Sequence, residues 1–155
     1  MRILIAVDES EYARAIGNFV VQSQWSTNSE FVVLSAVESL KIGSMMAVLP
    51  GPMLDEMFET SWKNAKKLVG DTANTIRDQI KSAPVREEVI EGRAAQVILQ
   101  FSQEWAADLI IMGSHGKTGF SKLMLGSVSL AVLSHASCSV LIVRLKSDAH
   151  KESSS

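Results

Sequence analysis

Residues 108–129 read DLIIMGSHGKTGFSKLMLGSVS: a short apolar run, a glycine-rich loop and the start of a helical pattern. The run over 108–112 is almost wholly apolar, which is typical of a central strand covered on both faces of a sheet. The residues from Ser127 to His135 predict a helix directly after the loop. A buried strand that leads through glycines into a helix is the building unit of parallel α/β folds, and this stretch therefore decides the fold class.

The same alternation of strands and helices extends over the rest of the chain. Apolar runs and helical spacing predict five strands and four helices in strict alternation, and the first helix is expected to begin at a Ser10 cap. This order predicts an α/β fold, a doubly wound five-stranded parallel sheet with helices on both faces, as in Rossmann-like proteins. The predicted strands cover 2–7, 31–37, 85–90 (an edge strand, because it is charged), 108–112 and 140–143, and the helices about 10–24, 54–80, 94–105 and 127–135.

Length and composition favour one ordinary soluble domain. The chain has 155 residues, of which 46% are hydrophobic and 21% charged, and its net charge is −2. We expect one nucleotide-binding domain over 1–145 and a polar, disordered tail over 146–155. The near-neutral charge argues against a nucleic-acid partner. No apolar window reaches membrane-spanning length, and no signal-peptide pattern opens the chain, so we expect a cytoplasmic protein with no membrane partner.

The loop after the fourth predicted strand carries groups suited to phosphate. Glycines at 113, 116 and 119 allow positive φ angles and let backbone N–H groups approach a ligand without a Cβ in the way. Residues 126–129 open the next helix, where unpaired N–H groups and the positive end of the dipole favour an anion. The hydroxyls of Ser127 and Ser129 add donors, and Lys117 adds a charge. The loop therefore predicts an anion or phosphate site.

Two common phosphate motifs are absent. Residues 116–118 (GKT) look like the end of a P-loop, but that motif requires glycine at position 111, which is Ile111. No GxGxxG follows the first strand, so the dinucleotide fingerprint is missing too. The pattern present is a different one: G-x-x-G, nine further residues, then G-S.

This pattern resembles the ATP-binding branch of the universal stress protein family. Gly113, Gly116, Gly126 and Ser127 fill the branch's G-x2-G-x9-G-[ST] motif, and the likeness extends over about 1–144 through ILIAVD, ADLIIMGSHG and HASCSVLIV. The resemblance implies ATP, with or without Mg²⁺, bound where the first and fourth strands end. The residues that it implies for the site are Ala6, Val7 and Asp8 at the adenosine end, Val37 near the base, Met112, Gly113, Ser114, His115, Gly116 and Lys117 around the ribose and phosphates, and Gly126, Ser127, Val128 and Ser129 on the phosphates.

Each of these residues also has a plainer interpretation. The glycine loop could be a structural turn, Asp8 could cap the first helix, and Lys117 could simply be solvated. We interpret His115 as a loop residue whose backbone matters more than its ring. His135 and Cys138 lie near each other, but two ligands do not make a zinc site. The methionine-rich stretch around 41–57 is either core packing with a flexible crossover, a mobile flap near the nucleotide, or a partner surface.

The functions that remain open differ in class. The leading hypothesis is an ATP-binding regulatory or stress-response protein. A slow ATPase or phosphotransferase is the rival, although no base or arginine finger can be named and no catalytic residue is assigned. A nucleotide-free interaction module and a flavin-binding protein are further alternatives. Val140 to Val143 predicts an apolar edge strand, and the resemblance implies pairing through this strand, so we expect a homodimer.

Overall fold

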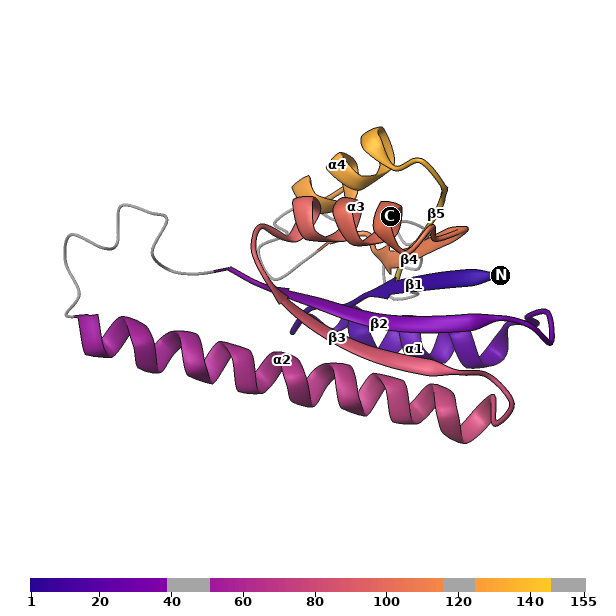
Figure 1. Cartoon of the computed structure of the whole chain (residues 1–155), viewed down its shortest axis with the longest axis horizontal. Coiled ribbons are helices and arrows are strands. Elements are labelled where there is room, and N and C mark those ends of the chain that lie inside the picture. Colours follow the sequence, from indigo (N-terminus) through magenta and orange to yellow (C-terminus); the bar gives the residue numbers. More distant parts are fainter. Residues whose placement is uncertain (39–50, 116–124, 146–155) are drawn as a thin grey trace, which may run out of the picture.

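The fold alternates strands and helices around one sheet (Figure 1). The computed structural model describes residues 1–38, 51–115 and 125–145. Its elements are β1 (Arg2–Ala6), α1 (Tyr12–Gln22), β2 (Glu30–Val37), α2 (Gly51–Gln79), β3 (Val85–Glu91), α3 (Ala94–Glu104), β4 (Leu109–Gly113), α4 (Ser127–His135) and β5 (Ser139–Val143). The strands form a parallel sheet in the order β3-β2-β1-β4-β5. The predicted fold class is confirmed.

The central strands form because every side chain in them has a core to enter. In β1, Ile3 and Ile5 belong to one apolar cluster, whereas Leu4 and Ala6 belong to the other. Successive side chains of a strand point to opposite faces, so a run without polar residues needs cover on both sides. Figure 1 shows this cover, with α1 and α2 on one face of the sheet and α3 and α4 on the other.

The order of strands reverses direction at β1. The chain moves outward from β1 through β2 to β3 and then returns to β4, on the other side of β1. Two neighbouring strands therefore send their connections to opposite faces, and a crevice opens beyond their carboxyl ends. The residues that follow β1 and β4 lie at this switch point.

The two edges of the sheet differ in character. β3 carries Arg86, Glu87 and Glu88, and Glu87 forms an ion pair with Arg77 of α2 at 2.6 Å. The prediction of a charged edge strand is confirmed. β5 forms the opposite edge, and its side chains from Val140 to Ile142 are only partly buried.

Two local predictions were wrong. Helix α1 begins at Tyr12 and its N-cap is Glu11, one residue after the predicted Ser10 cap, although Ser10 Oγ accepts from the Tyr12 backbone N–H at 3.4 Å. The hydroxyl of Ser10 donates to the carboxylate of Asp8, which also accepts a bond from the Ser10 backbone N–H at 3.1 Å. Met53 and Met57 are 50% and 39% exposed on α2, so they are not core residues.

Other predictions fall outside the described residues. These are the expected tail over 146–155, Met45 and Met46, and the glycines and lysine of the loop at 116, 117 and 119. Among the residues that are described, no helix combines the length and apolar character required to cross a bilayer.

Candidate functional site

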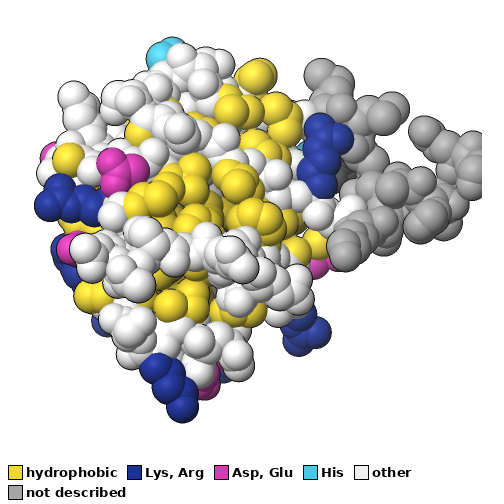
Figure 2. All heavy atoms as spheres, turned by 90° about the vertical axis from the view of Figure 1, so that its right-hand side faces the viewer, with side chains coloured by type: hydrophobic (Ala, Val, Ile, Leu, Met, Phe, Trp, Pro, Cys, Tyr) yellow, Lys and Arg dark blue, Asp and Glu magenta, His cyan; other side chains and the backbone are white. Residues whose placement is uncertain are grey.

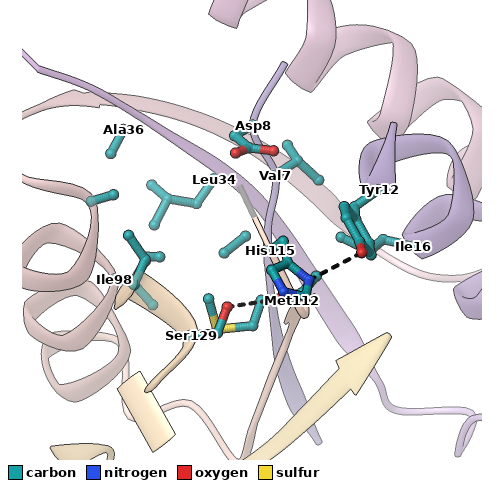
Figure 3. Close-up of a pocket in the computed structure, with 14 residues that line it drawn as sticks. Val7, Asp8, Tyr12, Ile16, Leu34, Ala36, Ile98, Met112, His115 and Ser129 are labelled. Atoms are coloured by element: carbon teal, nitrogen blue, oxygen red, sulfur yellow. Dashed lines mark hydrogen bonds between the residues drawn. The ribbon is translucent and has the colours of Figure 1, made fainter. Parts of the chain in front are cut away.

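A hollow lies beyond the carboxyl ends of β1 and β4, where the strand order reverses (Figure 3). Its volume is about 530 Å³, counting the open space at its mouth. β1 and β4 supply the floor, α1 and α3 the sides, and α4 one end. The lining residues are Ala6, Val7, Asp8, Tyr12, Ile16, Leu34, Ala36, Ala94, Ile98, Met112, Gly113, His115, Val128 and Ser129.

A second hollow adjoins the first and extends it toward α2. The two share Asp8, Ala36, Ala94 and Val128 in their walls. Val37 lines this second hollow rather than the first, together with Glu38 and residues of α2. In the first hollow, β2 and α3 contribute apolar side chains, and Ser129 of α4 and His115 contribute polar ones.

The start of α4 is fixed over the end of β4 by two hydrogen bonds. Gly126 donates its backbone N–H to the Ser114 carbonyl at 2.8 Å, and the Ser129 hydroxyl donates to the Gly113 carbonyl at 2.8 Å. Ser129 is 2% exposed. The first N–H groups of any helix have no partner within the helix, so the amides at the start of α4 are held at the end of the hollow. They form a site suited to an anion.

The hydrogen bond of Ser129 changes the role expected for its hydroxyl group. The hydroxyl proton of Ser129 is used by the Gly113 carbonyl, so Ser129 positions α4 and offers a ligand its backbone N–H. Ser127 opens α4 and is exposed. Gly126 has φ −61° and ψ 155°, angles that any residue adopts, so its place in the motif does not depend on a positive φ.

Gly113 is required by packing and not by backbone angle. Among the described glycines only Gly92 has a positive φ, at 148°, so the expectation of a positive φ at Gly113 was wrong. A Cβ at position 113 would lie 2.8 Å from both Cβ and Cγ of Tyr12. The glycine therefore lets α1 approach β4, and this approach brings Tyr12 into the wall of the hollow.

Three polar side chains meet beside Gly113. The Ser114 hydroxyl donates to the Tyr12 hydroxyl at 3.0 Å, and Nδ1 of His115 lies 3.1 Å from Ser114 Oγ and 3.3 Å from the Tyr12 hydroxyl. The Tyr12 and His115 rings are inclined at 34°, with centroids 6.2 Å apart. Nε2 of His115 is buried and has no hydrogen-bond partner among the described residues. The ring is thus part of the site, which the expectation of a backbone role alone did not include.

Most of the expected site residues come together, and several lining residues were missed. Gly116 and Lys117 lie outside the described residues. Tyr12 and Ile16 share the helical spacing of the first helix, and nothing in that spacing marks their contact with the hollow. Ala94 and Ile98 belong to α3, whose apolar spacing likewise predicts a buried face and not a ligand contact. The other missed residues are Leu34 and Ala36.

The site holds carboxylates but no metal-binding cluster in the part of the chain that the structure describes. Asp8, Glu9 and Glu38 line the second hollow. Within residues 1–38, 51–115 and 125–145, no group of three or more His, Cys, Asp or Glu side chains is arranged to hold a metal ion.

The sequence profile of the universal stress protein family matches residues 1–144. The chain belongs to the universal stress protein family. Universal stress protein A homolog 2 of Coxiella burnetii is 37% identical over 120 residues, which cover 77% of each chain. The strand order and the strand–loop–helix unit at the switch point are those of the fold of this family.

Solved structures of other universal stress proteins share the fold. The structure of MJ0577 of Methanocaldococcus jannaschii superposes with a TM-score of 0.80 at 24% identity, and covers 94% of this chain and 96% of that one. A universal stress protein of Arabidopsis thaliana, solved with AMP bound, superposes with a TM-score of 0.63 at 16% identity, over 96% and 94% of the two chains. Such relatives bind adenine nucleotides.

Proposed function

We propose that this universal stress protein binds ATP in the hollow at the switch point and acts as a nucleotide-dependent regulator. One observation supports this above the others: the start of α4 is hydrogen-bonded to the end of β4, so its free amides face the hollow's polar end. A polyphosphate there would accept from several N–H groups at once. The apolar wall formed by Leu34, Ala36 and Ile98 offers a surface for a base. That a relative is solved with AMP bound supports an adenine nucleotide as the ligand.

Several weak interactions would together provide the binding free energy. The helix dipole contributes about 0.3–1 kcal/mol. A micromolar complex needs about 8 kcal/mol, so hydrogen bonds to charged oxygens, at roughly 1.5–3 kcal/mol each, must supply most of the rest. Backbone amides at α4, the Asp8 region and the loop are the groups that would provide them. Mg²⁺, if used, would be held mainly through the phosphates, with Asp8 the nearest carboxylate of the wall.

A charge placed at the start of α4 tests the site. Val128→Asp puts a carboxylate into the wall of the hollow, where it would repel a phosphate, although an acidic residue in the first helical turn favours the helix itself. Leu130→Asp is the matched control, because Leu130 is 55% exposed on the same helix and does not line the hollow. In titration calorimetry with ATP, we expect Val128→Asp to lose at least tenfold in affinity and Leu130→Asp to bind as the wild type does. Equal affinity in all three would refute the placement.

Turnover is a separate question from binding. The described site presents no residue that we can assign as a base or as a charge on the transferred phosphoryl group. We therefore propose that ATP binds as a signal and is not consumed. Phosphate release measured over multiple turnovers with Mg²⁺ should stay at the buffer background. A sustained rate above background would favour the slow ATPase.

We further propose that the protein is a cytoplasmic homodimer joined through β5. β5 is an edge strand with partly buried apolar side chains, and α4 beside it exposes Leu130 and Leu133 at 55% and 39%. Figure 2 shows hydrophobic side chains gathered across the middle of one face of the molecule. An apolar edge left bare would pair with other chains. Sedimentation at micromolar concentration should give the mass of a dimer, and a monomer would refute this.

A further inference from the structure

Tyr12, Ser114 and His115 form a closed triangle of polar groups at the edge of the hollow. All three distances are within hydrogen-bond range: 3.0 Å between the hydroxyls, 3.1 Å from Ser114 Oγ to His115 Nδ1 and 3.3 Å from the Tyr12 hydroxyl to the same nitrogen. Tyr12 is 7% exposed and Ser114 2%. Buried hydroxyl groups need acceptors for their protons, so the positions of these protons can be worked out by counting.

The counting favours one tautomer of His115. Ser114 donates its proton to the Tyr12 oxygen. The Tyr12 proton then needs an acceptor, and Nδ1 of His115 is within reach. If Nδ1 accepts, both hydroxyl protons are used and the imidazole carries its proton on Nε2. If Nδ1 carried the proton instead, the Tyr12 hydroxyl proton would have no acceptor within this triangle. The arrangement thus places the N–H at Nε2.

Nε2 is the atom of this group that the protein leaves unpaired. It is the buried side-chain nitrogen or oxygen without a hydrogen-bond partner in the described part of the chain. Leaving a buried donor unpaired is costly, and such an atom in a native structure calls for a partner from outside the chain. His115 lines the hollow. In Figure 3 its ring lies on the side of Tyr12, away from the apolar side chains of Ala36, Leu34 and Ile98.

We propose that His115 donates a hydrogen bond from Nε2 to an oxygen of the sugar–phosphate part of the bound nucleotide. Tyr12 and Ser114 act as positioning residues, since they fix the ring and its tautomer. The inference rests on the proposed nucleotide site and names a donor within it. The apolar wall is suited to the base, so the polar side with His115 and the start of α4 is left for the sugar and phosphates.

Two substitutions at His115 separate its nitrogens. His115→Gln keeps an amide N–H at about the reach of Nε2, whereas the amide of His115→Asn reaches only about as far as Nδ1. With AMP as the probe in titration calorimetry, His115→Ala and His115→Asn should bind about tenfold or more weakly, and His115→Gln within about threefold of the wild type. Equal affinity of the alanine variant and the wild type would overturn the proposal, as would a glutamine variant as weak as the alanine one.

The two hydroxyls provide a separate test of the positioning role. Tyr12→Phe leaves the Ser114 hydroxyl beside Nδ1, and Ser114→Ala leaves the Tyr12 hydroxyl there, so each single variant should weaken AMP binding less than His115→Ala does. The double variant leaves Nδ1 without a donor and should weaken AMP binding several-fold, more than the two single effects combined. Additive or absent effects would overturn the positioning role.

Nitrogen-15 NMR of the imidazole shows the tautomer directly in the ligand-free protein. The chain has 3 histidines, and the His115 signal is the one missing in His115→Gln. We expect the proton on Nε2 in the wild type, and a proton on Nδ1 would overturn the inference. If the tautomer is as expected but neither AMP, ADP nor ATP binds to the wild type, the proposed function fails while the hydrogen-bond network stands. If AMP binds and the His115 variants bind it equally, only the inference fails.

Discussion

Replacing Gly113 by alanine would put a methyl group where Tyr12 already lies. The added Cβ would be 2.8 Å from Tyr12 Cβ and Cγ and 3.1 Å from Cδ1, closer than carbon atoms pack. The Cβ and Cγ atoms are fixed to α1, so the helix or the strand has to move. Overpacking of this kind costs about 1–3 kcal/mol. For a chain of this size about 2–4 °C is lost per kcal/mol, so the melting temperature of Gly113→Ala should fall by about 2–12 °C.

Gly17→Ala is the matched control for this experiment. Gly17 lies inside α1, and a Cβ there would meet the Cγ2 atoms of Thr72 and Thr75 at 4.0 Å, an ordinary contact. Alanine is favoured over glycine in a helix by about 1 kcal/mol, so this variant should melt higher by about 2–4 °C. Thermal unfolding followed by circular dichroism measures both. A Gly113→Ala protein that melts with or above the wild type would show that the close approach of α1 to β4 is not as described.

Three further predictions follow from single contacts. Gly92→Ala should destabilise the fold by at least about 1–3 kcal/mol in urea unfolding, because φ is 148° and the new Cβ would lie 2.8 Å from Val97 Cγ2. Ser129→Ala should cost about 1–3 kcal/mol in the same assay, because it removes the donor to the buried Gly113 carbonyl. Burial raises the pKa of the Cys138 thiol, so less thiolate is present at neutral pH, and alkylation of the native protein by iodoacetamide should be slower than that of free cysteine.

Each of these has a control on the same chain. Gly51→Ala should be neutral or slightly stabilising, because nothing lies within 4 Å of a Cβ there. Ser134→Ala removes an exposed bond to the Leu130 carbonyl and should cost less than Ser129→Ala. Unfolding in urea should bring the Cys138 alkylation rate to that of the free amino acid. Equal costs for the two serine variants, or rapid alkylation of the folded protein, would contradict the burial described.

The fold could be predicted because its signals are local. The continuous apolar run of β1 and the spacing in α4 are each contained in a few consecutive residues, and α4 begins and ends where the sequence indicated. The start of α1 was predicted one residue too early: Ser10 donates to Asp8 and accepts from the Tyr12 backbone N–H, while Glu11 takes the N-cap position. Propensity alone does not rank two such local bonds.

The site was predicted in outline and missed in its side chains. The motif located the end of β4 and the start of α4, but the contact between Tyr12 and Gly113 joins residues about a hundred positions apart. The same is true of the bonds of Tyr12 to Ser114 and His115. A single sequence has no signal for such contacts, and the glycine was therefore attributed to backbone freedom when it serves close packing.

The contrast between the two edges of the sheet limits how large an assembly can grow. If two copies join at β5, each outer edge of the joined sheet is a β3 strand. Further chains could then add only beside β3. That strand carries paired charges, Arg86 with Glu88, and its Val85 carbonyl already accepts from Arg77. An incoming chain would have to displace these groups before one of its strands could pair with β3. In such a dimer, further addition of chains would be hindered at both outer edges.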